Sequence, residues 1–294
     1  MGPTVVAVAV DPAATVWATT SGPTAASSTP TPTPTPTRSS PLAEASPQPA
    51  YAAALPAAAA RLGPERQPSW PLAPALQTIT LGQRLLERNA LGALANRHRF
   101  EAAGVRAVNL LSSPGSGKTA LLEALARLAA GARPPTRLAA LVGDLATELD
   151  ARRLEAAGLA AVAITTGQAC HLDAAMVARG LDALEARGVA LESLDLLLIE
   201  NVGNLVCPAA YDLGEQRRLV LLAVGEGEDK PLKYPATFHS ADVVVISKTD
   251  LAAAVGFERE RALAHLGAVA PGAALVEVSA RSGAGLDDPL DLLC

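Results

Sequence analysis

The sequence predicts an α/β protein with a doubly wound, mostly parallel sheet. From about residue 104 onwards, short apolar runs alternate with helical patterns. Near-continuous apolar strands between helices are typical of a parallel sheet that helices cover on both faces. The first of these strands leads into a glycine-rich turn and then into a helical pattern. Half of the residues are hydrophobic, which is enough for a sizeable core, although only 3% are aromatic.

Composition excludes several classes of function. The net charge of -5 and the pI near 5.5 give no support for binding to nucleic acid or to an acidic membrane surface. The three cysteines are too few and too scattered for a disulfide framework, so we expect a cytoplasmic protein. No apolar run reaches the length of about 18 residues that a membrane-spanning helix needs, so no such helix is predicted.

The first 76 residues are predicted to form a disordered, low-complexity tail. Fifteen of the 23 prolines lie within the first 74 residues, and residues 29–37 read TPTPTPTPT. Proline removes backbone donors and restricts φ, so a packed core is not expected there. Residues 77–103 then carry apolar residues at helical spacing before Gly104, which predicts an N-terminal helix.

Seven strands are expected in the domain that follows, from 104 to 294. Their apolar runs, separated for the most part by helical patterns, are 105–111, 137–142, 161–166, 194–200, 218–224, 242–247 and 274–279. In an open parallel sheet, ligands bind beyond the carboxyl ends of the strands. Functional residues are therefore expected near the end of each run.

The first strand ends in SSPGSGKT, residues 112–119. This is the phosphate-loop pattern of P-loop NTPases, with Ser112 in place of the opening glycine. Such glycines turn backbone amides toward phosphate oxygens, and the next helix adds its N-terminal dipole. Lys118 is expected to act catalytically at the phosphates, and Thr119 to bind Mg²⁺. Nucleotide contacts are expected at Ser113, Gly115, Ser116, Gly117, Lys118, Thr119 and Ala120. A glycine turn without a ligand is disfavoured by the flanking strand and helix.

The sixth strand ends in SKTD, residues 247–250, and this suggests a guanine site. The carboxylate of Asp250 matches the two donors on one edge of guanine, which adenine lacks, so GTP is favoured over ATP. The Lys248 stem is expected to lie along the base. Ser247 replaces the asparagine of the usual Asn-Lys-x-Asp motif. Backbone amides at Ser279 and Ala280, after the last strand, are expected to meet the guanine O6. The other interpretation of SKTD is a plain helix start.

Carboxylates follow two further strands. Asp144 and Asp150 lie in VGDLATELD, and Glu200 ends the fourth apolar run. Because Mg²⁺ prefers oxygen ligands, Asp150 and Glu200 join Thr119 as its expected ligands. Asp144 is the candidate for orienting the attacking water. The alternative role of both aspartates is capping of the next helix.

A cysteine and a histidine are adjacent in TTGQACHLDAA, residues 165–175, and the histidine is expected to begin a helix. Cys207 follows seven positions after Glu200. Thiolate and imidazole suit Zn²⁺ or Ni²⁺. Spacing alone leaves open a buried free cysteine instead of a metal site. However, both segments follow strands on the nucleotide-binding edge, where Cys170, His171 and Cys207 can converge.

Several of these stretches together resemble the HypB nickel-insertion GTPases of hydrogenase maturation, a branch of the SIMIBI-class P-loop GTPases. The similarity runs from about residue 80 nearly to the C-terminus, and ACHLDA with NVGNLVCPAAYDLGE carry its most specific marks. The resemblance implies that Cys170, His171 and Cys207 bind nickel or zinc. It further implies slow GTP hydrolysis and a GTP-dependent homodimer. A zinc-binding maturation partner and the hydrogenase large-subunit precursor are the implied partners. Many members add an N-terminal cysteine motif or histidine-rich store, and this sequence has no Cys before 170 and no His before 98.

Three other functions remain open from the sequence. A related nickel or cobalamin chaperone GTPase of the same class shares the phosphate loop but is expected to arrange its thiols differently. A P-loop small-molecule kinase leaves Asp250 unexplained. A metal carrier without GTP turnover is the third. Under the favoured hypothesis, Glu200 senses the nucleotide, and its loop moves the ligand Cys207.

Overall fold

The computed structural model describes residues 73–293. The tail predicted at residues 1–76 lies outside the described part as far as residue 72. The helix predicted from residue 77 begins at Ala73 and ends at Ala103. From Thr78 onwards the chain belongs to one compact unit. No helix among the described residues combines the length and the apolar character that crossing a bilayer requires.

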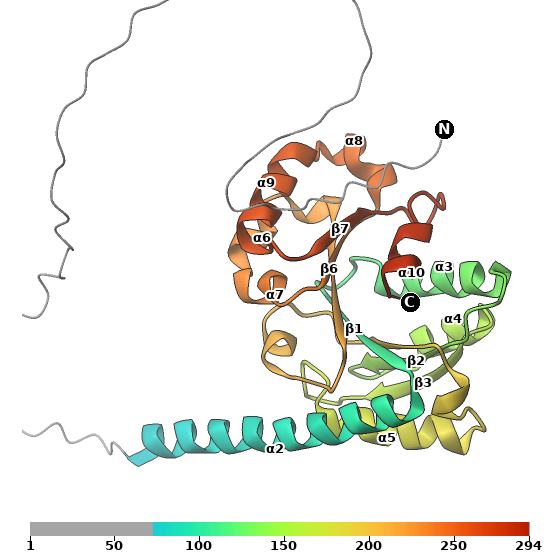
Figure 1. The fold of residues 1–294 in the computed structure, drawn as a ribbon. Helices are drawn as coiled ribbons and strands as arrows, with labels where there is room; N and C mark the ends of the chain where they lie inside the picture. The colour runs from blue at the N-terminus through green and yellow to red at the C-terminus, as the bar shows by residue number, and fades with distance from the viewer. Residues whose placement is uncertain (1–72, 294) are drawn as a thin grey trace, which may run out of the picture. The chain divides into compact units, whose positions relative to one another are not determined.

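A single sheet of seven parallel strands forms the centre of this unit (Figure 1). The strands are β1 (Arg106–Ser112), β2 (Leu138–Asp144), β3 (Ala160–Thr165), β4 (Leu196–Glu200), β5 (Arg217–Ala223), β6 (Val243–Ser247) and β7 (Ala274–Glu277). Their order across the sheet is β3-β2-β4-β1-β5-β6-β7. This confirms the predicted doubly wound fold. The strand β1 lies between β4 and β5, so the ends of these three strands meet at one place on the carboxyl edge.

Helices cover both faces of the sheet. The longer ones are α2 (Ala73–Ala103), α3 (Lys118–Gly131), α4 (Leu149–Ala156), α5 (Ala174–Ala186), α9 (Arg259–Val269) and α10 (Asp287–Leu293). Short helical turns are η1 (Leu191–Ser193), η2 (Cys207–Ala210), η3 (Val224–Glu226), α6 (Lys230–Lys233), α7 (Pro235–His239), η4 (Thr249–Leu251) and α8 (Ala252–Val255). Figure 1 shows α2 and α5 side by side along one side of the sheet.

The core divides according to the alternation of side chains along each strand. In β1, Val108 and Leu110 pack in a cluster with residues of α3, α4 and α10. Ala107 belongs to a second cluster with residues of α2 and α5 on the opposite face. A third cluster, around Phe238 and Leu266, covers that same opposite face over β5 and β6. Aliphatic side chains fill nearly all of this volume, as the low aromatic content requires.

The helix α2 is anchored by buried polar contacts. The Asn96 Nδ2 atom donates to Ala174 O at 2.9 Å and to Leu213 O at 3.0 Å. A Cβ atom on Gly214, whose φ is 92°, would lie 2.5 Å from Ala93 O. Only glycine permits this close approach of backbone to helix. The helix therefore joins the start of α5 to the loop that precedes β5.

Candidate nucleotide and metal site

The phosphate loop connects β1 to α3 with two residues in the left-handed region. Gly115 has φ of 74° and Gly117 has φ of 97°, which glycine adopts at little cost. Lys118 begins α3, is 7% exposed, and donates from Nζ to Ser112 Oγ at 2.9 Å. Ser112, the departure from the usual motif, thus holds the lysine. Burial lowers the pKa of Lys118, and the nearby charge of Glu200 partly opposes this shift.

A cavity of about 490 Å³ opens in front of this loop. It brings together Lys118, Thr119, Asp144, Asp150 and Glu200, from four different elements and loops. Other parts of its wall come from the phosphate loop, at Pro114, Gly115 and Gly117, and from the residues after β4, at Asn201, Val202 and Gly203. The volume and the phosphate loop suit the phosphate groups of a nucleotide.

Glu200 is the most deeply buried carboxylate of the cavity, at 5% exposed. Its Oε1 accepts a hydrogen bond from Thr119 Oγ1 at 2.9 Å. Its Oε2 is buried and has no hydrogen-bond partner among the described residues. Burial raises the pKa of Glu200 to about 7, against the opposing charge of Lys118. An unpaired oxygen beside a threonine hydroxyl fits a hard divalent cation such as Mg²⁺.

The two aspartates of the predicted set line the same cavity, but their carboxylates bond to partners other than Thr119. Asp144 Oδ1 accepts from the Leu145 backbone at 2.6 Å, and its Oδ2 accepts from the Thr147 hydroxyl. Asp150 Oδ1 pairs with Arg153 Nη1 at 3.1 Å. Neither occupies the N-cap of α4, which is Glu148. Asp144 braces a turn at the cavity wall, and Asp150 stands in the first turn of α4.

A smaller cavity of about 220 Å³ lies beside the phosphate loop, between the ends of β6 and β7. Its lining includes Lys248, Asp250 and Ala280. The Asp250 Oδ1 atom accepts from Ser279 Oγ at 2.7 Å. Lys248 Nζ donates to Gly115 O at 2.6 Å, which lays its stem across the phosphate loop. Ser247 Oγ donates to the Ser116 carbonyl at 2.8 Å, so it braces the loop although it replaces asparagine.

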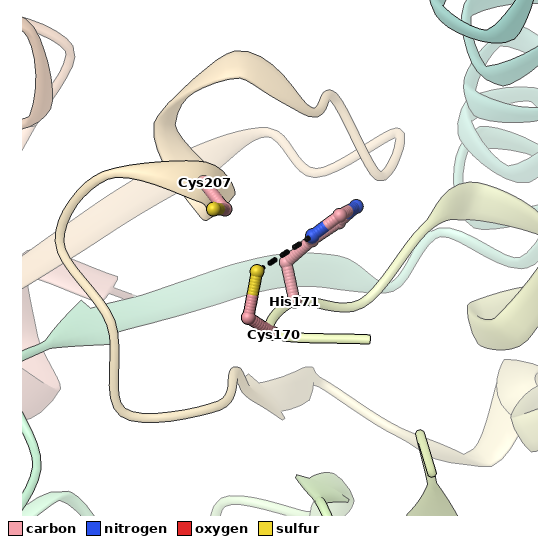
Figure 2. A group of neighbouring side chains, drawn as sticks. All are labelled: Cys170, His171 and Cys207. Atoms are coloured by element: carbon pink, nitrogen blue, oxygen red, sulfur yellow. Dashed lines mark hydrogen bonds between the residues drawn. The ribbon is translucent and has the colours of Figure 1, made fainter. Parts of the chain in front are cut away.

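Three side chains of types that can bind a metal converge next to the larger cavity (Figure 2). One donor atom from each of Cys170, His171 and Cys207 lies within 4.8 Å of the others. The Cys170 Sγ and His171 Nδ1 atoms are 3.7 Å apart. The imidazole ring stacks on Tyr211, with 3.8 Å between ring centroids.

The protonation of these donors is set by their surroundings. Burial lowers the pKa of His171, which favours the neutral imidazole that binds metals. The neighbouring thiol of Cys207 raises the pKa of Cys170. Bound metal reverses such a shift, because a coordinating thiol loses its proton.

The helix predicted to begin at His171 begins at Ala174 instead. Asp173 is its N-cap, and Asp173 Oδ1 accepts from the Met176 backbone at 2.7 Å. An N-cap residue has extended backbone, so the residues before it lie outside the helix. Cys170 and His171 therefore stand in the loop between β3 and α5, where their side chains face Cys207 (Figure 2).

The loop from β4 to Cys207 passes between the phosphate loop and the cysteine–histidine pair. A Cβ atom on Gly203 would lie 2.8 Å from Pro114 Cα, so the two backbones nearly touch. Asn204 forms a bridge with Ser112 and donates from Nδ2 to Cys170 O at 3.3 Å. The candidate nucleotide site and the candidate metal site thus share one loop as a common wall.

Comparison with known proteins decides the family. Residues 106–277 match the profile of the CobW/HypB/UreG nucleotide-binding domain. The hydrogenase maturation factor HypB of Azotobacter chroococcum mcd 1 is 45% identical over 247 residues, 82% of this chain and 78% of the relative. The factor of the same name from Azotobacter vinelandii is 48% identical over 210 residues, covering 71% of this chain and 67% of the relative.

A solved structure indicates the same family as these relatives. It is a crystal structure of HypB from Helicobacter pylori in complex with nickel. Its identity is 41% and its TM-score is 0.66, over 70% of this chain and 93% of that one. The chain belongs to the HypB family. It is accordingly a P-loop GTPase of the CobW/HypB/UreG group, and its phosphate loop lies within the matched nucleotide-binding domain.

Two features of this HypB-family site are missing from the sequence predictions. Glu226 Oε1 accepts from Ser116 Oγ at 2.6 Å, so a partly buried carboxylate braces the phosphate loop. The rule that identifies Glu200, a carboxylate at the end of an apolar run, nearly reaches Glu226, which follows its run after one glycine. The second feature is a set of buried asparagines, Asn109, Asn201 and Asn96. Asn109 interrupts an apolar strand, which signals a buried polar contact without naming its partner.

Proposed function

We propose that the protein is a GTP-hydrolysing metallochaperone that carries nickel for hydrogenase maturation. The observation that carries the proposal is the cluster of Cys170, His171 and Cys207, with donors within 4.8 Å of one another beside the nucleotide cavity. The names of the HypB relatives support the pathway, and the nickel complex of the Helicobacter pylori protein supports the metal. In this reading, nickel is cargo, and GTP is the substrate.

The donor set suits the release of a metal as well as its binding. Thiolate and imidazole ligands favour Ni²⁺ and Zn²⁺ over Mg²⁺ or Ca²⁺. Structural zinc sites are closed by four protein ligands, whereas three donors leave a position open. At an open position, the metal can bind a ligand of the receiving protein before the ligands of the metallochaperone dissociate. Zn²⁺ is the alternative cargo, because the same three side chains suit it.

The proposal gives each predicted residue of the nucleotide cavity a role. Lys118 and the amides at the start of α3 place positive charge where the β- and γ-phosphates lie, which stabilises the charge that builds up during phosphoryl transfer. Asp144 orients the attacking water. Mg²⁺, when bound through Thr119, Asp150 and Glu200, neutralises phosphate charge. Turnover is expected to be slow, as the resemblance to the HypB GTPases implies.

The base is recognised at the smaller cavity. Asp250 accepts the two donors of the guanine edge, and the amides of Ser279 and Ala280 meet O6. The hydroxyl of Ser279 already donates to Asp250, which holds the carboxylate at one orientation. A fixed carboxylate discriminates because adenine leaves it without partners.

The remaining parts of the proposal concern assembly. We propose a homodimer that forms with GTP. A zinc-binding maturation protein receives or supplies the metal, and the hydrogenase large-subunit precursor is its destination. The exposed Cys170 is consistent with handover, because a receiving ligand reaches it from solvent.

Nickel titration of the two nucleotide states tests the proposal. The protein is loaded with GDP or with a non-hydrolysable GTP analogue, and the Ni²⁺ dissociation constant is measured for each at one protein concentration. Allosteric couplings are typically about 5- to 150-fold, and a difference in that range is expected. Equal Ni²⁺ dissociation constants in both states would contradict a metallochaperone whose metal affinity depends on the bound nucleotide. Parallel titrations with Zn²⁺ decide which cargo is bound more tightly.

A further inference from the structure

Two neighbouring residues at the end of β4 point to opposite faces of the sheet. Leu198 packs with the α3 and α4 cluster, and Ile199 packs with the α5 cluster. This alternation continues beyond the strand. Glu200 contacts Thr119 at the nucleotide cavity, whereas Asn201 contacts the backbone of Leu172 in the loop before α5. One strand end therefore reaches both candidate sites through consecutive side chains.

Every polar atom of the Asn201 side chain is bonded in the interior. The residue is 1% exposed. Its Oδ1 accepts from the Leu172 and Val202 backbone N–H groups, both at 3.0 Å. Its Nδ2 donates to Asn109 Oδ1 at 3.2 Å. Breaking such a contact leaves a buried polar group without a partner, which costs more than an exposed contact does.

The hydrogen bond from Leu172 N–H to Asn201 Oδ1 holds the backbone beside the candidate metal ligands. Leu172 follows His171, so its backbone N–H lies one residue from the imidazole and two from the Cys170 thiol. Asn201 follows Glu200, and its own N–H donates to Leu110 O at 3.1 Å within the strand ladder. A displacement of the β4 end therefore moves the acceptor that holds the ligand-bearing loop.

A buried polar chain extends from Asn201 to the second ligand segment. Asn109 Nδ2 donates to Glu215 Oε1 at 3.2 Å. Glu215 Oε2 accepts from the Leu213 backbone at 2.7 Å. Leu213 lies two residues after Tyr211, the ring on which His171 stacks. The loop of Cys170 and His171 and the segment that follows Cys207 are thus both connected to Asn201. The connections run through backbone and side-chain amides and one carboxylate.

We propose that Asn201 is the positioning residue that transmits the nucleotide state to the cysteine–histidine cluster. The inference rests on the proposed function. It adds a second route from the nucleotide to the metal cluster, besides the movement of Cys207 with its loop. When Glu200 changes its partners, the β4 end shifts, and Asn201 Oδ1 carries Leu172, His171 and Cys170 with it. A merely structural asparagine would alter metal affinity equally in the GDP and GTP states.

Asn201→Ala tests the proposal in the full chain. Because Asn201 lines the nucleotide cavity, the GTP and GDP affinities of the variant are measured first, and each nucleotide is then kept saturating during the metal titrations. The ratio of Ni²⁺ dissociation constants between the GDP and GTP-analogue states should fall from the wild-type value toward one. If Asn201→Ala keeps the wild-type ratio, the proposal is overturned. If the wild-type ratio is itself one, the proposed coupled function fails first, so the two failures are distinguishable.

Asn96→Ala is the matched control. Asn96 is also a 1% exposed asparagine, and its two bonds reach Ala174 O and Leu213 O next to the same cluster. It has no bond to the β4 end. This variant should keep the wild-type ratio even where absolute nickel affinity changes. Loss of the ratio in both variants would show general loosening of the cluster and would overturn a specific role for Asn201.

Hydrogen exchange on the unmodified protein gives a second test if Asn201→Ala fails to fold. The exchange rate of the Leu172 amide should differ between the GDP and GTP-analogue states by about fivefold or more, since its acceptor is the transmitting atom. The Ala174 amide, which donates to Asn89 Oδ1 instead, serves as internal reference. Equal Leu172 exchange rates in both states would contradict the proposal.

Discussion

Asp250 illustrates how one side chain decides which nucleotide binds. Its carboxylate closes the smaller cavity, and Ser279 Oγ holds Oδ1 in place. Asp250→Asn replaces one acceptor by a donor, which opposes the 2-amino group of guanine and suits the carbonyl of xanthine. GTP affinity should fall by roughly 100-fold, from the loss of a charged hydrogen bond and the new repulsion. Competition binding with GTP and xanthosine triphosphate measures this change, and unaltered GTP affinity would remove Asp250 from base recognition.

Cys207 and Lys118 provide a second prediction at the residue scale. Cys207→Ala should weaken Ni²⁺ binding by roughly tenfold or more and leave GTP affinity unchanged, because the thiol lies outside the nucleotide cavity. Lys118→Ala should do the reverse, because the ammonium group lines that cavity. Separate metal and nucleotide titrations of both variants test the pair. If either variant loses both affinities, the two sites are not distinct.

At the scale of elements, α2 depends on a few buried contacts. Asn96→Ala leaves the Ala174 and Leu213 carbonyls without their partner, and α2 then holds α5 and the following loop less firmly. The free energy of unfolding should fall by about 2–3 kcal/mol, the usual cost of unsatisfied buried groups. Urea denaturation measures the loss.

A surface variant of the same helix is the control for this stability prediction. Arg99 pairs with Asp182 and Glu185 on α5, where these acidic side chains are 68% and 44% exposed. Exposed ion pairs contribute about 0–1 kcal/mol, so Arg99→Ala should lower stability much less than Asn96→Ala. Equal losses in the two variants would indicate that α2 is held by its surface charges.

At the scale of the whole molecule, the shared loop makes coupling reciprocal. If GTP changes the affinity for Ni²⁺ by some factor, Ni²⁺ must change the affinity for GTP, relative to GDP, by the same factor. Nucleotide titrations with and without saturating Ni²⁺, at one fixed protein concentration, should reproduce the factor from the metal titrations. A mismatch would mean that another equilibrium, such as dimerisation, has shifted between the two experiments.

Local sequence determined much of this protein. Apolar runs, helical patterns and the glycines of the phosphate loop act over a few residues. The apolar runs predicted the strands within about two positions. The same local logic selected Glu200 and Asp250. It misplaced the start of α5 by three residues, because the Asp173 cap competes with the helical pattern of its neighbours.

Only the tertiary structure decided which distant residues meet. Cys207 lies 36 positions after His171 in the sequence, and their approach depends on β3 and β4 ending at one edge with β2 between them. Apart from the adjacent Val202, the side-chain partners of Asn201 and Asn96 lie 29 to 117 positions away. A buried amide side chain indicates that a hydrogen-bond partner exists. The register of the sheet and the packing of α2 determine which residue that partner is. The coupling proposed for Asn201 therefore follows from the assembled fold.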